Sequence, residues 1–264
     1  MPEATVNVYG LDGKPVGSIK LPKVFETPYR PDVISRAVVA AQTHRFLPKG
    51  RDPIAGKRTT AESYGVGRGM ARISRVKGEQ YSEAGAGAFV PSTVGGRRTH
   101  PPRAEKSIYK KINRKERLLA LRSAIAATAV KNLVAGRGHR VEGVPSLPLV
   151  ASDEIQSLAR TVDVRNAFTS LGVWRDAERV LSAVKIRSGR GRMRGRGRKH
   201  GVGPLLVVAE DKGVGRAARN IPGVNVVRAK TLSIEALAPG TQSARLTVWS
   251  ESALKLMNQI FGGI

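Results

Sequence analysis

The feature that most constrains this fold is an interruption in the middle of the chain. From about residue 47 to residue 103 there is no hydrophobic periodicity, and Gly, Pro, Ser, Thr, Lys and Arg surround single apolar residues such as Ile73 and Phe89. A loop of this length is uncommon inside a compact domain and usually serves a function or is disordered. We favour a function. The pattern predicts a globular domain formed by residues 1–46 and 104–264, and an extended basic loop formed by residues 47–103.

The interrupted region is strongly cationic. Between Arg45 and Arg117 there are 18 Lys or Arg residues and 6 Asp or Glu residues. The whole chain has 46 Lys or Arg against 20 Asp or Glu, which gives a formal net charge of +26. Such a surface repels itself and requires a polyanion. Nucleic acid is the obvious partner because phosphate contacts release condensed counterions. At about 3.3 Å per residue, roughly 28 residues out and as many back limit the reach of the loop to about 90 Å.

Several function classes have no support in the sequence. No stretch approaches the roughly 18 apolar residues of a membrane span, and the first residues lack the basic-then-apolar pattern of a signal peptide. We therefore expect a soluble intracellular protein without a membrane partner. The chain has no cysteine, which excludes disulfides and thiolate metal sites. Phosphate-binding loops, zinc-protease motifs and nucleophile elbows are absent, so we expect no enzyme, cofactor, metal or small-molecule substrate.

Histidines and carboxylates are the residues that could form a metal-binding or catalytic site. The four histidines are dispersed, and each lies close to Arg or Lys, which favours RNA contact or a structural role over metal binding; they are His44, His100, His139 and His200. Four carboxylates lie near the ends of predicted strands, where α/β enzymes keep their sites; they are Asp153, Glu154, Glu210 and Asp211. Helix caps explain these four equally well.

Outside the loop, the apolar spacing predicts regular structure. We expect a hairpin over residues 4–24 around Asp12-Gly13, a helix from Pro31 to about Phe46, and one long helix from Ile108 to Gly136. The second half alternates apolar runs with helical segments, which indicates an α/β fold with a parallel or mixed sheet. These elements are expected at residues 147–150, 152–159, 164–171, 177–184, 205–209, 224–227, 246–249 and 253–260.

The long helix should carry a cationic face. Its exposed positions hold six cations and one acid, Glu116; the cations are Lys110, Lys111, Arg114, Lys115, Arg117 and Arg122. A charged helix face is often only solvated. Here the lack of regular Glu-to-Lys pairing favours phosphate contact.

Three glycine-rich clusters indicate close approach to RNA. The segment Lys185–His200 has eight Lys or Arg, four Gly and no acid in sixteen residues, and lies between a predicted helix and a predicted strand. Arginine forks bind phosphate or stack on bases, and glycine lets the backbone approach closely; a disordered polyanion-binding loop is the alternative. Tyr64–Arg72 has Gly-x-Gly spacing but lacks the flanking strand and helix of a dinucleotide site. Gly95–Pro102 joins glycines, two arginines and a Pro pair, so we expect phosphate contact.

These motifs, in this order, resemble the L-four family of large-subunit ribosomal proteins, of the archaeal or eukaryotic type. The resemblance spans nearly the whole chain and includes Thr93–Pro102, Lys110–Arg117, Gly203–Val208, Asn220–Val224 and Leu237–Gly240. It implies a Rossmann-like α/β domain whose long loop penetrates ribosomal RNA and helps line the nascent-peptide exit tunnel. No long basic extension follows the last predicted helix, which favours the archaeal type.

The resemblance implies a structural role in the cytoplasmic large ribosomal subunit. The partners would be large-subunit ribosomal RNA, neighbouring ribosomal proteins, and the nascent peptide near the loop tip. The tip would comprise Gly65, Gly67, Arg68, Gly69, Met70 and Arg72. We expect RNA contacts from Arg51, Lys57, Arg58, Tyr64, Arg68, Arg72, Arg75, Arg97, Arg98, His100, Arg103, Lys110, Lys111, Arg114, Arg187, Arg190, Arg192, Arg194, Arg196, Arg198, Lys199 and His200.

A DNA- or chromatin-associated architectural protein is the alternative, since charge and Arg-Gly tracts alone do not distinguish DNA from RNA. Duplex binders generally present a helix, ribbon or arm to a regular groove. The glycine-spaced loop suits irregular RNA better. We expect the loop to be disordered in the free protein and to order on RNA.

Overall fold

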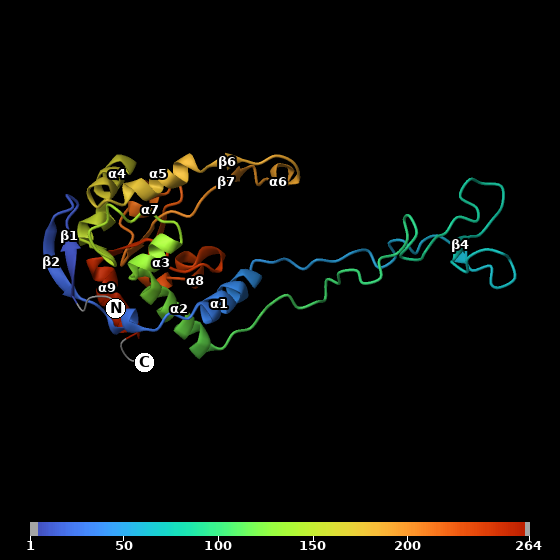
Figure 1. Ribbon diagram of the computed structural model, residues 1–264, viewed down its shortest axis with the longest axis horizontal. Coiled ribbons are helices and arrows are strands. Elements are labelled where there is room, and N and C mark those ends of the chain that lie inside the picture. The colour runs from blue at the N-terminus through green and yellow to red at the C-terminus, as the bar shows by residue number, and fades with distance from the viewer. Residues whose placement is uncertain (1–4, 262–264) are drawn as a thin grey trace. The chain divides into compact units, whose positions relative to one another are not determined.

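The computed structural model describes residues 5–261, and its chain divides into two compact units (Figure 1). One unit comprises residues 1–42 and 110–264, and the other comprises residues 43–109. The division falls a few residues outside the loop boundaries expected from the sequence. Residue 4 of the expected hairpin and the ends of the expected globular domain lie outside the described residues. Within the described range, no helix is long and apolar enough to cross a membrane.

A six-stranded sheet forms the centre of the first unit, in the order β2-β1-β5-β10-β8-β9. The strands are β1 (Thr5–Tyr9), β2 (Pro15–Lys20), β5 (Leu149–Ala151), β8 (Leu205–Val208), β9 (Asn225–Arg228) and β10 (Thr247–Ser250). β1 and β2 form the expected antiparallel hairpin, and the other neighbours are parallel. The predicted mixed, mainly parallel sheet is confirmed. β10 comes last in the chain but lies between β5 and β8.

The central strands β5, β8 and β10 are buried on both faces of the sheet, and their residues alternate between two hydrophobic clusters. Leu205 and Val207 point into one cluster, whereas Leu206 and Val208 point into the other. Helices that contribute to the first cluster are η1 (Lys23–Glu26), α1 (Pro31–Thr43), α2 (Arg114–Thr128), α8 (Ile234–Leu237) and α9 (Glu251–Phe261). Those of the second are α3 (Lys131–Gly136), η2 (Asp153–Ser157), α4 (Thr161–Ser170), α5 (Trp174–Ser182) and α7 (Val214–Ala218). The short helix η3 (Ala229–Thr231) adds Ala229 to the first cluster, and a further short helix is η4 (Pro239–Thr241).

The prediction of one helix from Ile108 to Gly136 was wrong. Residues 108–113 are not helical, and Val130 is extended, with φ −93° and ψ 107°, between α2 and α3. Ile125 of α2 packs in the first hydrophobic cluster, whereas Val134 of α3 packs in the second. The chain leaves the helical conformation at Val130 as it passes from α2, which packs mainly in the first cluster, to α3, which packs in the second. The apolar spacing hides this interruption because both helices continue the same pattern.

The second unit contains little regular structure. Strands β3 (Ala61–Glu62) and β4 (Arg75–Val76) pair antiparallel, and Arg75 forms a further bridge with Gly87. Val76 and Ala88 are the only buried residues between positions 44 and 109, and each is still 9% exposed. The segment therefore has turns and short strands but no core of the ordinary kind.

Candidate nucleic-acid interface

The second unit exposes most of the cations that the sequence analysis assigned to RNA. Exposed members of that set are Arg51, Lys57, Arg58, Tyr64, Arg68, Arg72, Arg98, His100 and Arg103. Arg58 is held by Asp52 through a 2.6 Å hydrogen bond, so its charge is partly neutralised. The remaining members, Arg75 and Arg97, are half-buried.

Arg75 and Arg97 make contacts that organise the unit itself. Arg75 donates a 2.9 Å hydrogen bond from Nη1 to the carbonyl of Gly85. The Arg97 guanidinium lies 5.9 Å from the centre of the Phe89 ring, and its backbone N–H donates to the Phe89 carbonyl. These two arginines hold turns together and have less freedom to reach a phosphate than their exposed neighbours.

Glycine is required where two parts of the unit meet. A Cβ atom on Gly56 would lie 2.6 Å from the backbone of Gly96 and Arg97, and one on Gly96 would lie 2.0 Å from the carbonyl oxygen of Val90. Only hydrogen fits at either position. Gly96 belongs to the Gly95–Pro102 cluster that was expected to approach RNA, whereas in the structure Gly96 and Gly56 allow close contact within the unit.

The Tyr64–Arg72 segment is an exposed turn. Gly65, Gly67 and Gly69 have φ angles of 75°, 81° and 64°, in the left-handed region that favours glycine, and no atom lies within 4 Å of their missing Cβ positions. Ser63 closes the turn by donating from Oγ to the Arg72 carbonyl at 2.9 Å. Sequence reasoning missed Ser63, although serine beside glycine is a common turn signal. The turn presents Arg68, Met70 and Arg72 to the outside.

The cationic segment before α2 differs from the expected helix face. Lys110 and Lys111 are exposed but precede the helix, and Arg114 begins it. Glu116 forms an ion pair of 2.9 Å with Arg36. Arg122, expected to face phosphate, instead lies over the Phe261 ring at 5.7 Å and donates to the Phe261 carbonyl. Its position contradicts the prediction, because the final helix α9 covers that part of α2.

The Arg-Gly tract forms a hairpin between α5 and β8 in the first unit (Figure 1). Strands β6 (Lys185–Ile186) and β7 (Arg198–Lys199) pair antiparallel, and α6 (Arg190–Met193) forms the tip. Every Lys and Arg of the tract is exposed, as is His200; the cations are Lys185, Arg187, Arg190, Arg192, Arg194, Arg196, Arg198 and Lys199. No ion pair in the described part of the chain neutralises any of them.

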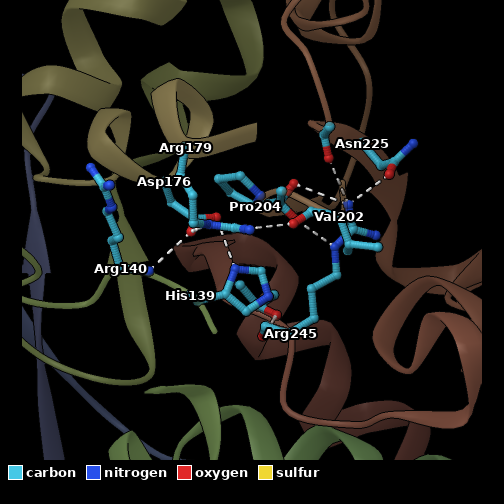
Figure 2. A network of polar contacts seen from close by, with 11 residues as sticks. His139, Arg140, Asp176, Arg179, Val202, Pro204, Asn225 and Arg245 are labelled. Atoms are coloured by element: carbon cyan, nitrogen blue, oxygen red, sulfur yellow. Dashed lines mark hydrogen bonds and ion pairs between the residues drawn. The ribbon is translucent and has the colours of Figure 1, made fainter. Parts of the chain in front are cut away.

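A buried polar network lies beneath the hairpin (Figure 2). Asp176 of α5 is fully buried and accepts hydrogen bonds from His139 Nδ1 at 2.8 Å, Arg140 N at 3.0 Å and Arg179 Nε at 2.9 Å. Arg179 also donates from Nη2 to the carbonyl of Val202 at 2.7 Å. Val202 lies just after the hairpin, so the network ties the chain that leaves the hairpin to α5.

Arg245 is the second centre of this network. Its buried guanidinium donates to the carbonyls of Gly203, Pro204, Ala236 and Gly223, and to Asn225 Oδ1 at 2.6 Å. Four of these partners lie where β8 and β9 begin, at the amino edge of the parallel strands, and the fifth, Ala236, lies in α8. Burial lowers the pKa of Arg245 to about 10, which leaves it charged at neutral pH. One side chain thereby fixes the starts of three neighbouring strands, its own included.

Burial also controls the charges of His139 and Asp176. Burial lowers the pKa of His139, assisted by the nearby charges of Arg137 and Arg179 and opposed by Asp176, so the imidazole is neutral and donates from Nδ1. For Asp176, burial opposes ionisation, but hydrogen bonds from His139 and Arg179 outweigh it and lower the pKa. RNA contact and a structural role were both open for His139, and its enclosed position beside Asp176 supports the structural role. No local sequence signal marks Asp176 or Arg245.

The opposite edge of the sheet, where α/β enzymes place their sites, is closed by internal hydrogen bonds. Asp153 Oδ1 accepts from Ser252 N, Ser252 Oγ and Gln156 Nε2, and Gln156 Oε1 accepts from Glu210 N. Asp211 accepts from the backbone of Gly213 and Gly215, next to the start of α7. Asp153 and Asp211 therefore cap the first turns of α9 and α7, which is the role that the sequence offered as the alternative to a catalytic site. Within residues 5–261, no group of three or more His, Asp or Glu could hold a metal ion.

Comparison with known proteins identifies relatives of the whole chain. The model of the "Ribosomal protein L4/L1 family" matches residues 19–260. Three proteins named "Large ribosomal subunit protein uL4" come from archaeal methanogens. That of Methanococcus vannielii is 50% identical over 97% of this chain and 99% of its own length. The Methanosphaera stadtmanae protein is 48% identical over 98% of both, and that of Methanococcus maripaludis strain C6 is 51% identical over 97% and 99%.

Proposed function

The chain belongs to the ribosomal protein L4/L1 family, and on that premise we propose that it is a structural protein of the large ribosomal subunit. It binds large-subunit ribosomal RNA, contacts neighbouring ribosomal proteins and supports assembly of the subunit. The observation that carries this proposal is the presence of two separate cationic segments, residues 43–109 and 185–200, whose basic side chains are mostly exposed. Ribosomal RNA supplies phosphates over a surface large enough for both.

The Tyr64–Arg72 turn is the part that we assign to the nascent-peptide exit tunnel. Its three glycines with positive φ have no side chains, so the turn is narrow. Its exposed Arg68, Met70 and Arg72 offer both charged and apolar contacts to a passing peptide. Its side chains do not pack in a hydrophobic core, so they can contact RNA on one side of the turn and peptide on the other.

The loop as a whole acts as an RNA-penetrating segment that orders on binding. With only Val76 and Ala88 buried between residues 44 and 109, apolar burial supplies little stability to that unit by itself. Phosphate and stacking contacts would offset the entropy of ordering. An architectural role on DNA has no support from the relatives, each of which is named as a large-subunit ribosomal protein.

Sedimentation of a tagged copy from cells tests this function. Large subunits are separated through gradients of rising salt, and the tagged chain is quantified in each fraction. A ligand held by six to ten phosphate contacts alone loses on the order of a thousandfold in affinity between about 50 and 200 mM salt. A threaded loop keeps the chain in the large-subunit peak at one copy per subunit. Recovery in light or chromatin fractions would refute the ribosomal function.

A further inference from the structure

A groove of about 450 Å³ lies at the base of the Arg-Gly hairpin. Its walls come from the end of α5, from β7 and the residue that follows it, and from the segment between α7 and β9. The side chains that matter here are Leu181, Val184, Arg198, His200, Arg219 and Pro222. Three are apolar, three are basic or histidine, and no carboxylate lines the groove.

The floor of the groove is rigid. Gly223 has φ 76°, and a Cβ atom there would lie 2.8 Å from both Val180 Cγ1 and the backbone nitrogen of Gly203. The Gly223 carbonyl and the Asn225 side chain both accept hydrogen bonds from Arg245, at 3.0 and 2.6 Å. The buried network therefore builds this surface before any ligand arrives, and a preformed surface loses little entropy on binding.

The rim is cationic and unpaired. Arg198, His200 and Arg219 are exposed, and no ion pair among the described residues involves them. Leu181 is 57% exposed, although it is a large apolar residue beside the groove. Of two other grooves, one is lined by the single cation Lys131. The other combines apolar side chains with Lys110, Lys111 and Arg36, and Arg36 is paired with the carboxylate of Glu116.

We propose that this groove binds one unstacked nucleotide of single-stranded RNA. The base lies on the apolar surface of Leu181, Val184 and Pro222, and the flanking phosphates contact Arg198 and Arg219. Apolar and basic groups together suit an extruded nucleotide, because every base has an apolar face and every nucleotide carries a phosphate. A base inside a duplex is stacked on both of its faces and therefore cannot lie on these apolar side chains. This inference rests on the proposed ribosomal RNA binding and specifies one contact within it.

The test is photo-crosslinking of the full chain to a short oligonucleotide that contains 4-thiouridine. Trypsin cleaves after Lys and Arg, so the groove is reported by two peptides, residues 180–185 and 220–228. Leu181→Glu replaces one of the apolar side chains that would contact the base with a carboxylate. Val162→Glu makes the same charge change at a residue of α4 that is 64% exposed and does not line the groove. Circular dichroism checks that both variants remain folded.

We expect crosslinks at both groove peptides, with the yield lowered about tenfold by Leu181→Glu, as for loss of a stacked base. Val162→Glu should leave that yield unchanged, and crosslinks at the Arg-Gly tract should persist in both variants. The inference is overturned by any of three results: no crosslink at the groove peptides while the tract crosslinks, equal yields in the two variants, or equal crosslinking of a duplex. Displacement by polyglutamate as readily as by unlabelled oligonucleotide would also overturn it. Each of these results leaves the ribosomal function standing, which the salt gradient tests separately.

Discussion

Nδ1 of His139 donates a 2.8 Å hydrogen bond to Oδ2 of Asp176, and both side chains are almost completely enclosed. His139 follows α3, whereas Asp176 lies in the first turn of α5. Asp176 also accepts from Arg179, which reaches on to the Val202 carbonyl after the Arg-Gly hairpin. A buried carboxylate therefore links the packing of two helices to the base of a cationic segment, and its loss should affect both.

Asp176→Asn should destabilise the protein strongly. All three atoms that face the Asp176 carboxylate are donors, so an amide nitrogen would oppose one of them, and Arg179 would lose its charged partner. Breaking a buried charge pair costs roughly 3–5 kcal/mol. Urea unfolding followed by circular dichroism measures this loss. Asp163→Asn, in the exposed first turn of α4, should cost less than about 1 kcal/mol. Similar losses in the two variants would contradict the assigned role of Asp176.

Stability should fall as the pH drops below about 6.5, the ordinary pKa of histidine. The pKa of His139 is lowered in the folded protein, so the unfolded chain takes up a proton there first, and folding becomes less favourable as the pH falls. We expect His139→Gln to flatten the pH dependence of the free energy of unfolding between about pH 7 and 5. His200→Gln changes an exposed histidine and should keep the wild-type slope. Parallel curves for wild type and His139→Gln would rule out this linkage.

Arg245→Lys should loosen the amino edge of the sheet. The guanidinium serves five acceptors, whereas an ammonium group has three donors and lacks the planar fork. The carbonyls left without a donor should cost roughly 2–4 kcal/mol in the free energy of unfolding. Hydrogen exchange should show reduced protection at the starts of β8 and β9. Arg216→Lys, at an exposed position of α7, provides the control, and a loss as large there would show that the effect is not specific.

Replacement of Arg190, Arg192, Arg194 and Arg196 by Gln should weaken ribosomal RNA binding and its salt dependence together. Each lost phosphate contact should reduce the slope of log affinity against log salt by about 0.7–0.9. The matched control replaces four exposed cations outside the hairpin, namely Arg160, Arg175, Lys212 and Arg216. Filter binding at several salt concentrations measures both slopes. Equal reductions would mean that net charge, and not the hairpin, determines affinity.

Limited proteolysis of the free protein should cut residues 47–103 well before the α/β unit. That segment has short strands and almost no buried apolar surface, so its local opening should cost little free energy. Binding to large-subunit ribosomal RNA should protect it. Mass spectrometry of the earliest fragments identifies the cleavage positions. Resistance of the free segment equal to that of the α/β unit would show that the loop is already folded.

Local patterns in the sequence predicted much of the fold. The hairpin around Asp12-Gly13, the helix that begins at Pro31, and the alternation of strands and helices after Leu147 all depend on turn residues and apolar spacing. The extended character of the middle segment follows from its lack of apolar residues. These features depend on neighbours in the chain, so they can be read without tertiary structure.

The structure adds what the sequence did not predict at residues whose contacts come from distant segments of the chain. Val130 interrupts the helical pattern where the chain passes from α2, which packs mainly in the first cluster, to α3, which packs in the second. Arg122 was expected at phosphate but lies against Phe261, more than a hundred residues away in the chain. The basic neighbours of His139 in the sequence left RNA contact and a structural role open, and only the structure shows that its partner is Asp176.

The sequence by itself determined that this protein is an α/β domain interrupted by a cationic segment and that it needs a polyanion, because composition, charge and periodicity are properties of the chain. Only the tertiary structure decided which cations are available to RNA. Arg245 and Arg198 have the same side chain, but one is buried among five acceptors and the other is exposed beside a groove. The physical reason is that burial and hydrogen bonding depend on the strand order, and that order brings Gly203, Gly223 and Arg245 to one edge of the sheet.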